Sequence, residues 1–180
     1  NDRDFLGMDG YHGYGTNDVY KTEPALGDMD KRKELVDKSH EKGMRVIIDL
    51  VLNRTGYKHP WAREAGKQDW FHDPKLSFKQ DMEKGSLFGL PDLAQEKPEV
   101  ADYLINMAKY GARETNCDGF RLDAIMHFPS EFQTRFSDEM NKERGKDFFL
   151  LGEAYTGSPQ RIQHLPGSGT LDTVYAFPFS

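Results

Sequence analysis

The stretch Met44-Arg-Val-Ile-Ile-Asp-Leu-Val-Leu52 decides the fold class of this chain of 180 residues. It is a near-continuous apolar run interrupted by Asp49, and such a run is typical of a strand that is buried on both faces of a parallel sheet. A helix is predicted just before it, over about residues 31–42, with Asp30 as its cap and Gly43 as its stop. A helix that leads directly into a buried strand indicates a fold of the α/β class.

Helices and apolar strands alternate along the rest of the chain. Pro98 suits the first turn of a helix over about 98–115, and Ser130 can cap a further helix over 130–144. The apolar runs that follow are predicted strands: Gly119–Ile125, Phe148–Ala154 and Leu171–Phe177. This alternation predicts parallel βα units, and the absence of a G-x-G-x-x-G turn after a strand favours a barrel over an open dinucleotide-binding sheet.

The segment between the first strand and the helix at 98–115 has no regular pattern. From Asn53 to Leu90, aromatic residues are scattered among charged residues, glycine and proline, and the stretch is too long for a simple connection between a strand and a helix. We interpret it as an inserted lobe. The expected organisation is a first part of the main domain at 1–53, the lobe at 54–90, and a second part of the main domain at 91–180.

Composition and charge exclude several classes of protein. The 24 lysines and arginines against 30 aspartates and glutamates give a formal charge of −6, which argues against nucleic-acid binding through phosphate neutralisation. Cys117 alone cannot form an internal disulfide. The longest strongly apolar stretch is far shorter than the ~20 residues of a membrane span. No basic-then-apolar leader opens the chain, so either a targeting segment was removed or none belongs to this piece. We favour a secreted or periplasmic location slightly over a cytoplasmic one.

Acidic residues stand at the ends of the predicted strands. In parallel α/β folds the carboxyl ends of the strands form the active-site face, which would bring Asp123 and Glu153 close together. Two carboxylates ~5–5.5 Å apart are what retaining glycoside hydrolysis requires. Arg121, on the same side of its strand as Asp123, would keep that carboxyl ionised. The spacing alone equally allows a structural ion pair of Asp123 with Arg121, with Glu153 capping the next helix.

Five stretches of the chain form a recognisable set. They are Tyr11-His-Gly-Tyr14, Asp49-Leu-Val-Leu-Asn53, Leu90-Pro-Asp92-Leu, Gly119-Phe-Arg-Leu-Asp123-Ala-Ile-Met-His127 and Leu150-Leu-Gly-Glu153-Ala. Together they resemble signature regions of the α-amylase family of glycoside hydrolases, in the order and at the spacing of that family. The run Leu87-Phe-Gly-Leu-Pro-Asp-Leu-Ala-Gln95 is most similar to the amylase, neopullulanase and cyclomaltodextrinase branch.

The resemblance implies both a fold and a set of residue roles. The fold is a parallel (β/α)8 TIM-type barrel, of which this chain forms about strands 3 to 6, with the lobe inserted between strand 3 and its helix. Asp123 matches the nucleophile, Glu153 the general acid/base, and Arg121 the arginine that positions the nucleophile. The implied substrate contacts are Tyr14, which would stack on the sugar ring, together with His12, Asp49, Arg54 and His127.

The resemblance also implies a structural calcium ion. In family members that bind calcium, the residues matching Asn53 and Asp92 and the backbone carbonyl of the residue matching His127 are ligands. Hard oxygen ligands from the lobe and the barrel suit the chemistry of Ca²⁺. The alternative is that Asn53 hydrogen-bonds the backbone while Asp92 caps a turn after Pro91.

Other aromatic and histidine side chains need a less specific interpretation. The aromatic residues of the lobe could line outer sugar subsites, but we expect them to form the core of the lobe: Trp61, Trp70 and Phe71. The remaining histidines show no metal-ligand spacing and are expected at the surface: His40, His59, His72 and His164.

Two positions depart from the family pattern. Arg54 stands where the family usually has a histidine that hydrogen-bonds the reacting sugar, and an arginine is longer and permanently charged. Met126 stands where many α-1,4-acting members carry a lysine on the leaving side. The third family carboxylate, in an Asn-His-Asp-type motif, is expected beyond Ser180. Because a closed barrel takes ~250 residues, we interpret the chain as the central piece of a larger enzyme that requires the remainder of the barrel.

The leading hypothesis is a retaining glycosidase. It would cleave α-glucosidic bonds, α-1,4 in the first instance, in starch-type glucans, maltooligosaccharides or cyclodextrins. The expected partner is therefore an α-glucan or oligosaccharide. Two alternatives stay open: a transglycosylase or isomerase of the same family, which uses the same residues, and a non-catalytic amylase-like binding scaffold.

Overall fold

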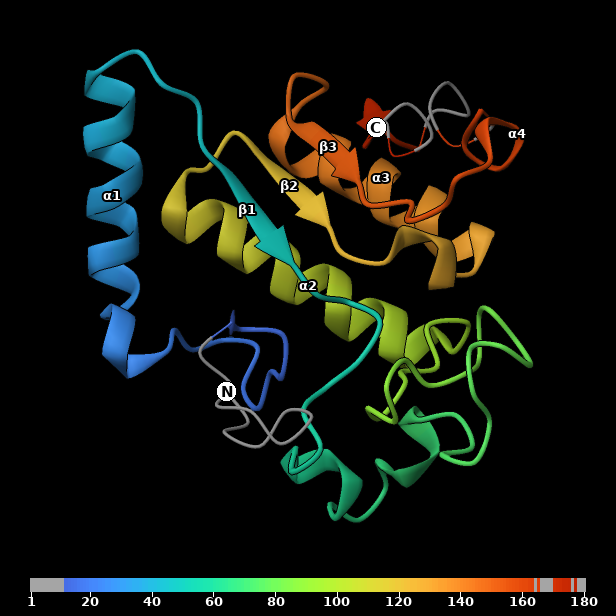
Figure 1. Ribbon diagram of the computed structural model, residues 1–180. Helices are drawn as coiled ribbons and strands as arrows, with labels where there is room; N and C mark the ends of the chain where they lie inside the picture. Colours follow the sequence, from blue (N-terminus) through green and yellow to red (C-terminus); the bar gives the residue numbers. More distant parts are fainter. Residues whose placement is uncertain (1–11, 164, 166–169, 176, 178–180) are drawn as a thin grey trace.

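Four parallel strands form the centre of the molecule in a computed structural model, which describes residues 12–163, 165, 170–175 and 177. Their order in the sheet, β1-β2-β3-β4, follows the chain, as Figure 1 shows. The strands are β1 (Ile47–Leu50), β2 (Gly119–Leu122), β3 (Phe149–Gly152) and β4 (Thr173–Val174). The helices are α1 (Met29–Glu41), α2 (Pro98–Thr115), α3 (Ser130–Arg144) and the short α4 (Pro159–Ile162). Single 3₁₀ turns lie at Pro24–Leu26, Pro60–Ala62, Gln68–Trp70 and Ile125–His127.

The core lies between the sheet and the helices α2 and α3. Helix α2 buries an apolar stripe at helical spacing, including Leu104, Ala108 and Ala112, and Figure 1 shows α2 and α3 on the same side of the strands. Phe120 of β2 and Phe136 of α3 are among the largest fully buried side chains. Since one face of the sheet is covered in this way, polar side chains on the strands project to the other face or beyond the strand ends.

Three expectations about these elements were wrong. The predicted first strand is not buried on both faces: Ile47 is 39% exposed, because the helices α2 and α3 cover only one face of the described sheet. Helix α1 is capped by Asp28, which accepts a hydrogen bond from the backbone of Lys31, and not by Asp30. Ser130 is the first residue of α3 and makes no cap hydrogen bond.

The last predicted strand is shorter than expected. Only Thr173–Val174 of the stretch Leu171–Phe177 pairs with β3, and Ala176 lies outside the described residues. The first eleven residues of the chain, including Tyr11, and also His164 lie outside them too. None of the helices that the structure describes is long and apolar enough to cross a membrane.

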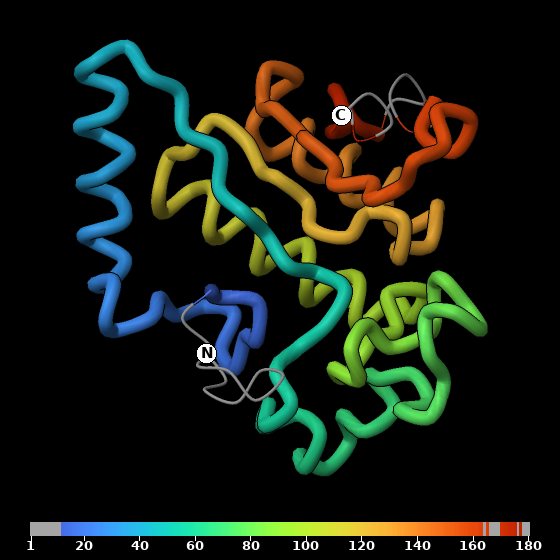
Figure 2. Tube along the Cα trace, viewed as in Figure 1, coloured from blue at the N-terminus to red at the C-terminus, as the bar shows by residue number. Residues whose placement is uncertain are grey.

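The lobe is joined to the sheet at a narrow neck formed by residues 53–55 and 91–93. Arg54 and Asp92 form an antiparallel bridge there. The backbone amide of Thr55 donates to the carbonyl of Pro91 at 3.0 Å, and that of Leu93 donates to the carbonyl of Asn53 at 2.8 Å. Figure 2 shows the chain leaving β1 into the lobe and returning from it to the start of α2. The neck therefore fixes the lobe against the carboxyl end of β1.

An aromatic cluster packs the lobe onto α2. Trp61, only 7% exposed, makes edge-to-face contacts with Trp70 and with Tyr103 of α2 at ring-centroid distances of 5.1 and 4.8 Å. The ammonium group of Lys67 lies 4.6 Å from the Trp61 ring centroid and 4.8 Å from that of Trp70. Trp61 and Trp70 are core residues, as the sequence predicts, but they pack in one cluster with α2 and not in a separate core of the lobe.

Candidate active site

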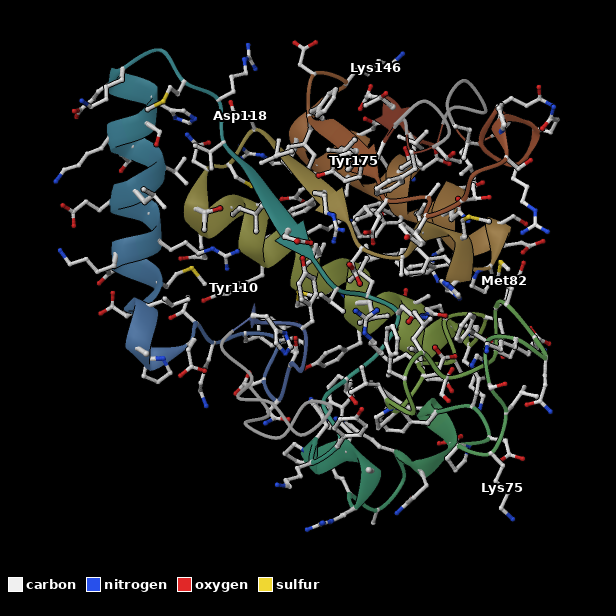
Figure 3. The ribbon with its side chains drawn as sticks, viewed as in Figure 1. Lys75, Met82, Tyr110, Asp118, Lys146 and Tyr175 are labelled. Atoms are coloured by element: carbon white, nitrogen blue, oxygen red, sulfur yellow. The ribbon has the colours of Figure 1, made fainter. Side chains whose placement is uncertain are left out.

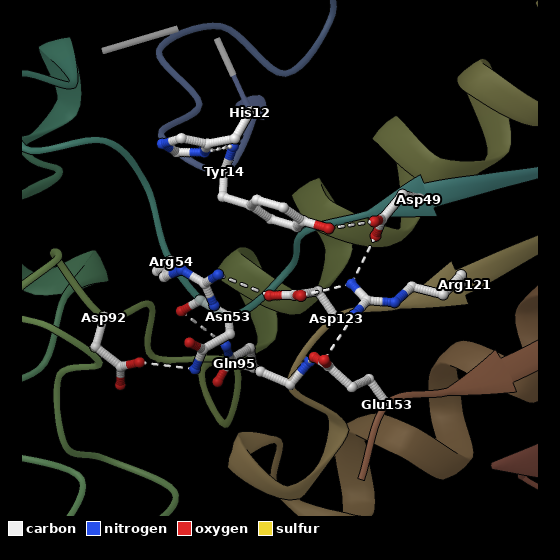
Figure 4. Close-up of polar contacts among 11 residues, drawn as sticks. His12, Tyr14, Asp49, Asn53, Arg54, Asp92, Gln95, Arg121, Asp123 and Glu153 are labelled. Atoms are coloured by element: carbon white, nitrogen blue, oxygen red, sulfur yellow. Dashed lines mark hydrogen bonds and ion pairs between the residues drawn. The ribbon is translucent and has the colours of Figure 1, made fainter. Parts of the chain in front are cut away.

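The polar side chains predicted at the strand ends meet at one place. Asp49 of β1 and Arg121 of β2 are directly paired across the parallel ladder. Asp123 follows β2, and Glu153 follows β3. Because parallel strands end on the same edge of a sheet, these four side chains converge, as Figure 4 shows.

Arg121 is the centre of this cluster. Its Nη1 donates to Asp123 Oδ1 at 2.5 Å and to Asp49 Oδ1 at 2.9 Å. Its Nη2 lies 2.8 Å from Glu153 Oε1. Burial by itself would lower the pKa of the guanidinium, but the hydrogen bonds to Asp123 and Asp49 raise it. One fixed cation thus holds three carboxylates from three adjacent strands.

The turn after β2 sets the relative position of Asp123 and Glu153. The amide of Asp123 continues the ladder by donating to the carbonyl of Leu50 at 3.1 Å. Ala124 then adopts a left-handed conformation with φ 51°, and its amide donates to Glu153 Oε2 at 3.2 Å. The amide of Ile125 donates to the backbone carbonyl of Glu153 at 3.0 Å. This turn ties the two carboxylates together.

The two carboxyl groups have different surroundings. Asp123 is 4% exposed and contacts two guanidinium groups, those of Arg121 and Arg54. Burial raises the pKa of Glu153, and the charge of Asp123 raises it too, although the Ala124 amide and Arg121 act in the opposite direction. A buried carboxylate held by two guanidinium groups, beside a carboxyl whose pKa is raised, is the arrangement used by a nucleophile and a general acid.

Arg54 contacts the same carboxylate from the side of the lobe. Its Nη2 lies 2.7 Å from Asp123 Oδ2, and both side chains are buried. Within the described residues, Nε and Nη1 of Arg54 have no hydrogen-bond partner. The sequence shows that position 54 departs from the family pattern, but it does not reveal this contact with Asp123.

Tyr14 and His12 lie above the cluster, on the loop that precedes α1. The Tyr14 hydroxyl donates to Asp49 Oδ2 at 2.7 Å. Burial and, to a smaller extent, this hydrogen bond raise the pKa of Tyr14 to about 12. His12 stacks on the Tyr14 ring at a centroid distance of 5.8 Å. Tyr14 also lines the cleft, which is where an aromatic platform for a sugar ring would have to lie.

A cleft of about 580 Å³ opens over these groups. The polar wall contains Arg54, Arg121, Asp123, Glu153, His127 and Arg161. The rest of the lining is largely apolar: Tyr14, Phe78, Met82, Leu87, Phe88, Ala124, Met126 and Tyr155. Figure 3 places the labelled Met82 on the lobe. Its carbonyl lies 2.7 Å from Nδ1 of His127, so the lobe closes one side of the cleft.

Several of these lining residues were not singled out from the sequence. Phe78, Tyr155 and Arg161 carry no motif, and only the folding of the lobe and of the segment after β3 brings them to the cleft. His72 and His59 were expected at the surface, but His59 is buried and His72 lies against Asp92 and Glu96. A histidine between acidic residues distant in sequence leaves no local signal.

Two of the three expected calcium ligands are in contact. Asn53 Nδ2 donates to Asp92 Oδ1 at 2.7 Å, and Asp92 Oδ2 lies 2.7 Å from Nδ1 of His72. Asn53 Oδ1 is buried and, among the described residues, has no hydrogen-bond partner. A buried amide oxygen without a donor, together with a neighbouring carboxylate, provides the oxygen ligands that a hard cation such as Ca²⁺ prefers. The third expected ligand is the backbone carbonyl of His127, whose side chain contacts the carbonyl of Met82.

Comparison with known proteins identifies the family of the chain. The sequence profile described as "Alpha amylase, catalytic domain" matches residues 4–180. The chain is 37% identical to a beta/alpha-amylase of Paenibacillus polymyxa over 93% of its length, and 32% identical to a cyclomaltodextrinase of a Bacillus species over 94%. It spans only 14% and 32% of those two proteins.

Solved structures agree on the fold. The α-amylase of Geobacillus thermoleovorans in complex with acarbose is 43% identical, with a TM-score of 0.89, over 94% of this chain and 38% of that one. An Anoxybacillus α-amylase is 45% identical, with a TM-score of 0.90 and the same coverage. The parallel sheet described above is accordingly part of a TIM-type barrel. The chain belongs to the α-amylase family, within its catalytic domain.

Proposed function

We propose that the protein containing this chain is a retaining glycosidase that cleaves α-1,4-glucosidic bonds in starch-type glucans, maltooligosaccharides or cyclodextrins. The observation that carries the proposal is that the guanidinium of Arg121 contacts both Asp123 and Glu153. The two carboxyl groups lie side by side, but Asp123 also contacts Arg54, whereas Glu153 does not. Relatives named cyclomaltodextrinase and α-amylase support the substrate class. The chain spans about a third of such relatives, so the activity is proposed for the intact protein.

The reaction follows from the two carboxyl groups. Glu153, whose pKa is raised by burial, donates a proton to the glycosidic oxygen as the bond to the leaving sugar breaks. Asp123 attacks the anomeric carbon and forms a covalent glycosyl-enzyme intermediate. The Glu153 carboxylate then removes a proton from water, which attacks the same carbon and releases Asp123. Two displacements retain the configuration of the sugar.

The roles are tested by replacing each carboxyl group in the intact protein. Asp123→Asn and Glu153→Gln should each lower kcat on maltooligosaccharides by about 10²–10⁴-fold or more. With 4-nitrophenyl glycosides, whose leaving group needs little protonation, Glu153→Gln should keep much more activity than Asp123→Asn. Substantial hydrolysis of maltooligosaccharides by either variant would refute the assigned roles.

Transfer to an acceptor other than water is the second candidate. The apolar part of the cleft, with Phe78, Met82 and Met126 on its wall, favours a bound acceptor over water on the leaving side. Chromatography of the products from maltotriose separates the two: net release of reducing ends indicates hydrolysis, and products longer than the substrate indicate transfer. A binding scaffold without catalysis would give neither product.

We also propose a structural calcium ion at the neck of the lobe. Asn53 Oδ1 and the carboxylate of Asp92 would hold it with the backbone carbonyl of His127, and the ion would fasten the lobe to the strand ends. Calcium should raise the Tm of the intact protein treated with chelator, and Asp92→Asn should abolish the increase. Asp37→Asn, at an exposed position of α1, should leave it unchanged. An unaltered Tm in the parent protein would refute the site.

A further inference from the structure

Tyr175 lies in the same row of side chains across the sheet as the two carboxyl groups of the active site. Arg121 of β2 pairs with Leu151 of β3, and Leu151 pairs with Thr173 of β4. Glu153 and Tyr175 each stand two residues further along their strands, as the nucleophile does after β2, and side chains two residues apart share a face. The fourth strand therefore contributes a tyrosine where the second and third contribute carboxyl groups.

The backbone continues this row beyond the ends of the strands. Leu122 and Gly152 are paired in the ladder. The amide of Glu153 donates to the carbonyl of Leu122 at 2.9 Å, and the amide of Tyr175 donates to the carbonyl of Gly152 at 3.1 Å. The two bonds are made at one level of the sheet, so the ladder that fixes Glu153 also fixes Tyr175.

The ring of Tyr175 contacts the guanidinium of Arg121. Cζ of Arg121 lies 5.9 Å from the centroid of the Tyr175 ring and 6.0 Å from that of the Tyr14 ring. The N–H groups of a guanidinium lie in its plane, and there those of Arg121 meet three carboxylates. The faces of a guanidinium carry no N–H group and are weakly hydrated, so aromatic rings pack well on them. The two tyrosine rings thus restrict movement of the guanidinium out of its plane.

The two tyrosines differ in their other contacts. Tyr14 lines the cleft and donates a hydrogen bond to Asp49, so a bound sugar would touch its ring. Tyr175 does not belong to the cleft lining. Its ring packs against that of Phe177 at a centroid distance of 5.6 Å. Tyr175 is therefore placed to act on Arg121 and not on the sugar.

We propose that Tyr175 is a positioning residue whose ring holds the guanidinium of Arg121 in the orientation that meets the three carboxylates. The proposal rests on the glycosidase function given above and adds a residue to that same site. Because Arg121 contacts both Asp123 and Glu153, a tilt of its guanidinium displaces the nucleophile and the acid together. Tyr175 therefore affects the chemical step more than substrate binding.

The first test replaces the ring in the intact protein. Tyr175→Leu keeps an apolar side chain but removes the aromatic face. On maltooligosaccharides its kcat should fall by about 3–30-fold, the range that loss of one cation–π contact gives, while KM changes by less than about 2-fold. Tyr175→Phe keeps the ring and should restore kcat to nearly the parent value.

A matched control is available on the loop before α1. Tyr20 is 37% exposed, compared with 39% for Tyr175, and its ring contacts Tyr103 and Tyr110 of α2. It lies outside the cleft lining. Tyr20→Leu makes the same replacement and should leave kcat unchanged.

A double-mutant cycle shows whether Tyr175 acts through Arg121. In Arg121→Gln the guanidinium is gone, so adding Tyr175→Leu should lower the residual kcat no further. The pH profile of kcat/KM gives a second readout. Arg121 lowers the pKa of Glu153, so a displaced guanidinium lowers it less, and the basic limb should move upward in Tyr175→Leu. A purely structural defect would lower Tm without moving this limb.

An isosteric ring keeps the proposal testable should Tyr175→Leu fail to fold. Pentafluorophenylalanine at position 175 preserves the shape of the phenylalanine ring but withdraws electron density from its face, which removes the attraction for a cation. Its kcat should be about 3-fold or more below that of Tyr175→Phe.

Three results would overturn the proposal. The first is a Tyr175→Leu variant with the kcat of the parent, or one in which only KM rises. The second is an equal loss of kcat from Tyr175→Leu with and without Arg121→Gln. The third is a Tyr175→Phe variant as slow as Tyr175→Leu, which would assign the effect to the hydroxyl. In each case, inactive Asp123→Asn and Glu153→Gln variants leave the glycosidase function standing, so the two failures can be told apart.

Discussion

A single residue, Arg121, links the fold to the chemistry. It lies on β2 between two neighbouring strands, so its guanidinium reaches Asp49 on one side and Glu153 on the other. A lysine has one charged nitrogen and could not replace these parallel contacts. The arrangement explains why the carboxyl groups of three strands can lie together without mutual repulsion dominating.

Removing the charge of Arg121 should change the pH dependence of the enzyme. Arg121 lowers the pKa of Glu153 against the effects of burial and of Asp123. In Arg121→Gln the pKa of Glu153 should therefore rise, so that the acid keeps its proton to higher pH and the basic limb of kcat/KM moves upward. We also expect kcat to fall by about 10²-fold or more, since the nucleophile loses its positioning partner.

The pH profile of kcat/KM on a maltooligosaccharide measures both effects. Arg113→Gln is a suitable control, because Arg113 is half exposed on α2 and pairs with Glu143 far from the cleft. A basic limb that stays in place or moves to lower pH in Arg121→Gln would contradict the assignment of Glu153 as the acid.

At the scale of elements, a cluster of aromatic rings and one cation attach the lobe to α2. Lys67 lies over Trp61, Trp70 and Tyr103, the last at 5.5 Å from its ring centroid. Because Tyr103 belongs to α2, this contact joins the lobe to the helix that covers the sheet. A partly desolvated cation–π contact is worth ~1–2 kcal/mol.

Replacement of Lys67 should loosen the lobe while the sheet stays folded. Lys67→Met keeps the length of the side chain but removes the charge, so the free energy of unfolding should fall by ~1–2 kcal/mol, and cleavage within the lobe by chymotrypsin should accelerate. Lys75→Met, at an exposed position of the same lobe, provides the comparison. Equal rates of cleavage in the two variants would mean that the contact of Lys67 with the aromatic rings does not hold the lobe.

The helices were predicted better than the strands or the lobe. Pro98–Thr115 and Ser130–Arg144 have the bounds that their apolar spacing predicts, because each combines an apolar stripe with clear end signals. The cap of α1 was misplaced, since Asp28 and Asp30 are equally good acceptors in sequence and only the backbone geometry selects Asp28. The lobe shows no helical or alternating periodicity of apolar residues, so the backbone pairing at its neck could not be predicted.

Contacts between residues distant in sequence also limit what can be predicted about the site. The residues at the strand ends could be placed together, because parallel pairing brings successive strand ends to one edge. The contact of Arg54 with Asp123 could not, because it depends on the pairing of Arg54 with Asp92, which is distant in sequence. Local patterns carry no information on such pairings.

At the scale of the whole molecule, the edge strand β1 affects how the chain behaves when it is produced alone. In the described sheet β1 pairs on one side only, and Ile47 is among the exposed large hydrophobic residues. Backbone groups along such an edge readily pair with another chain. The neighbours that this edge requires are expected in the remainder of a barrel of ~250 residues.

The 180-residue chain produced alone should therefore self-associate and hydrolyse no maltooligosaccharide. Light scattering coupled to gel filtration would detect the association, and hydrogen exchange should show rapid exchange of the β1 amides compared with those of β2. The intact protein should neither self-associate through β1 nor show rapid exchange of the β1 amides. A monomeric, active chain of 180 residues would contradict the requirement for the rest of the barrel.

The neck makes the lobe a segment that can be exchanged as a unit. The chain enters and leaves the lobe through paired backbone at Arg54 and Asp92, so a replacement that keeps this pairing need not move the strand ends that carry Asp123 and Glu153. Insertion or shuffling of lobes among relatives could then alter one wall of the cleft while the reacting groups stay in place. Grafting a lobe between residues 55 and 91 offers a route to new specificities in which chemistry and recognition are varied separately.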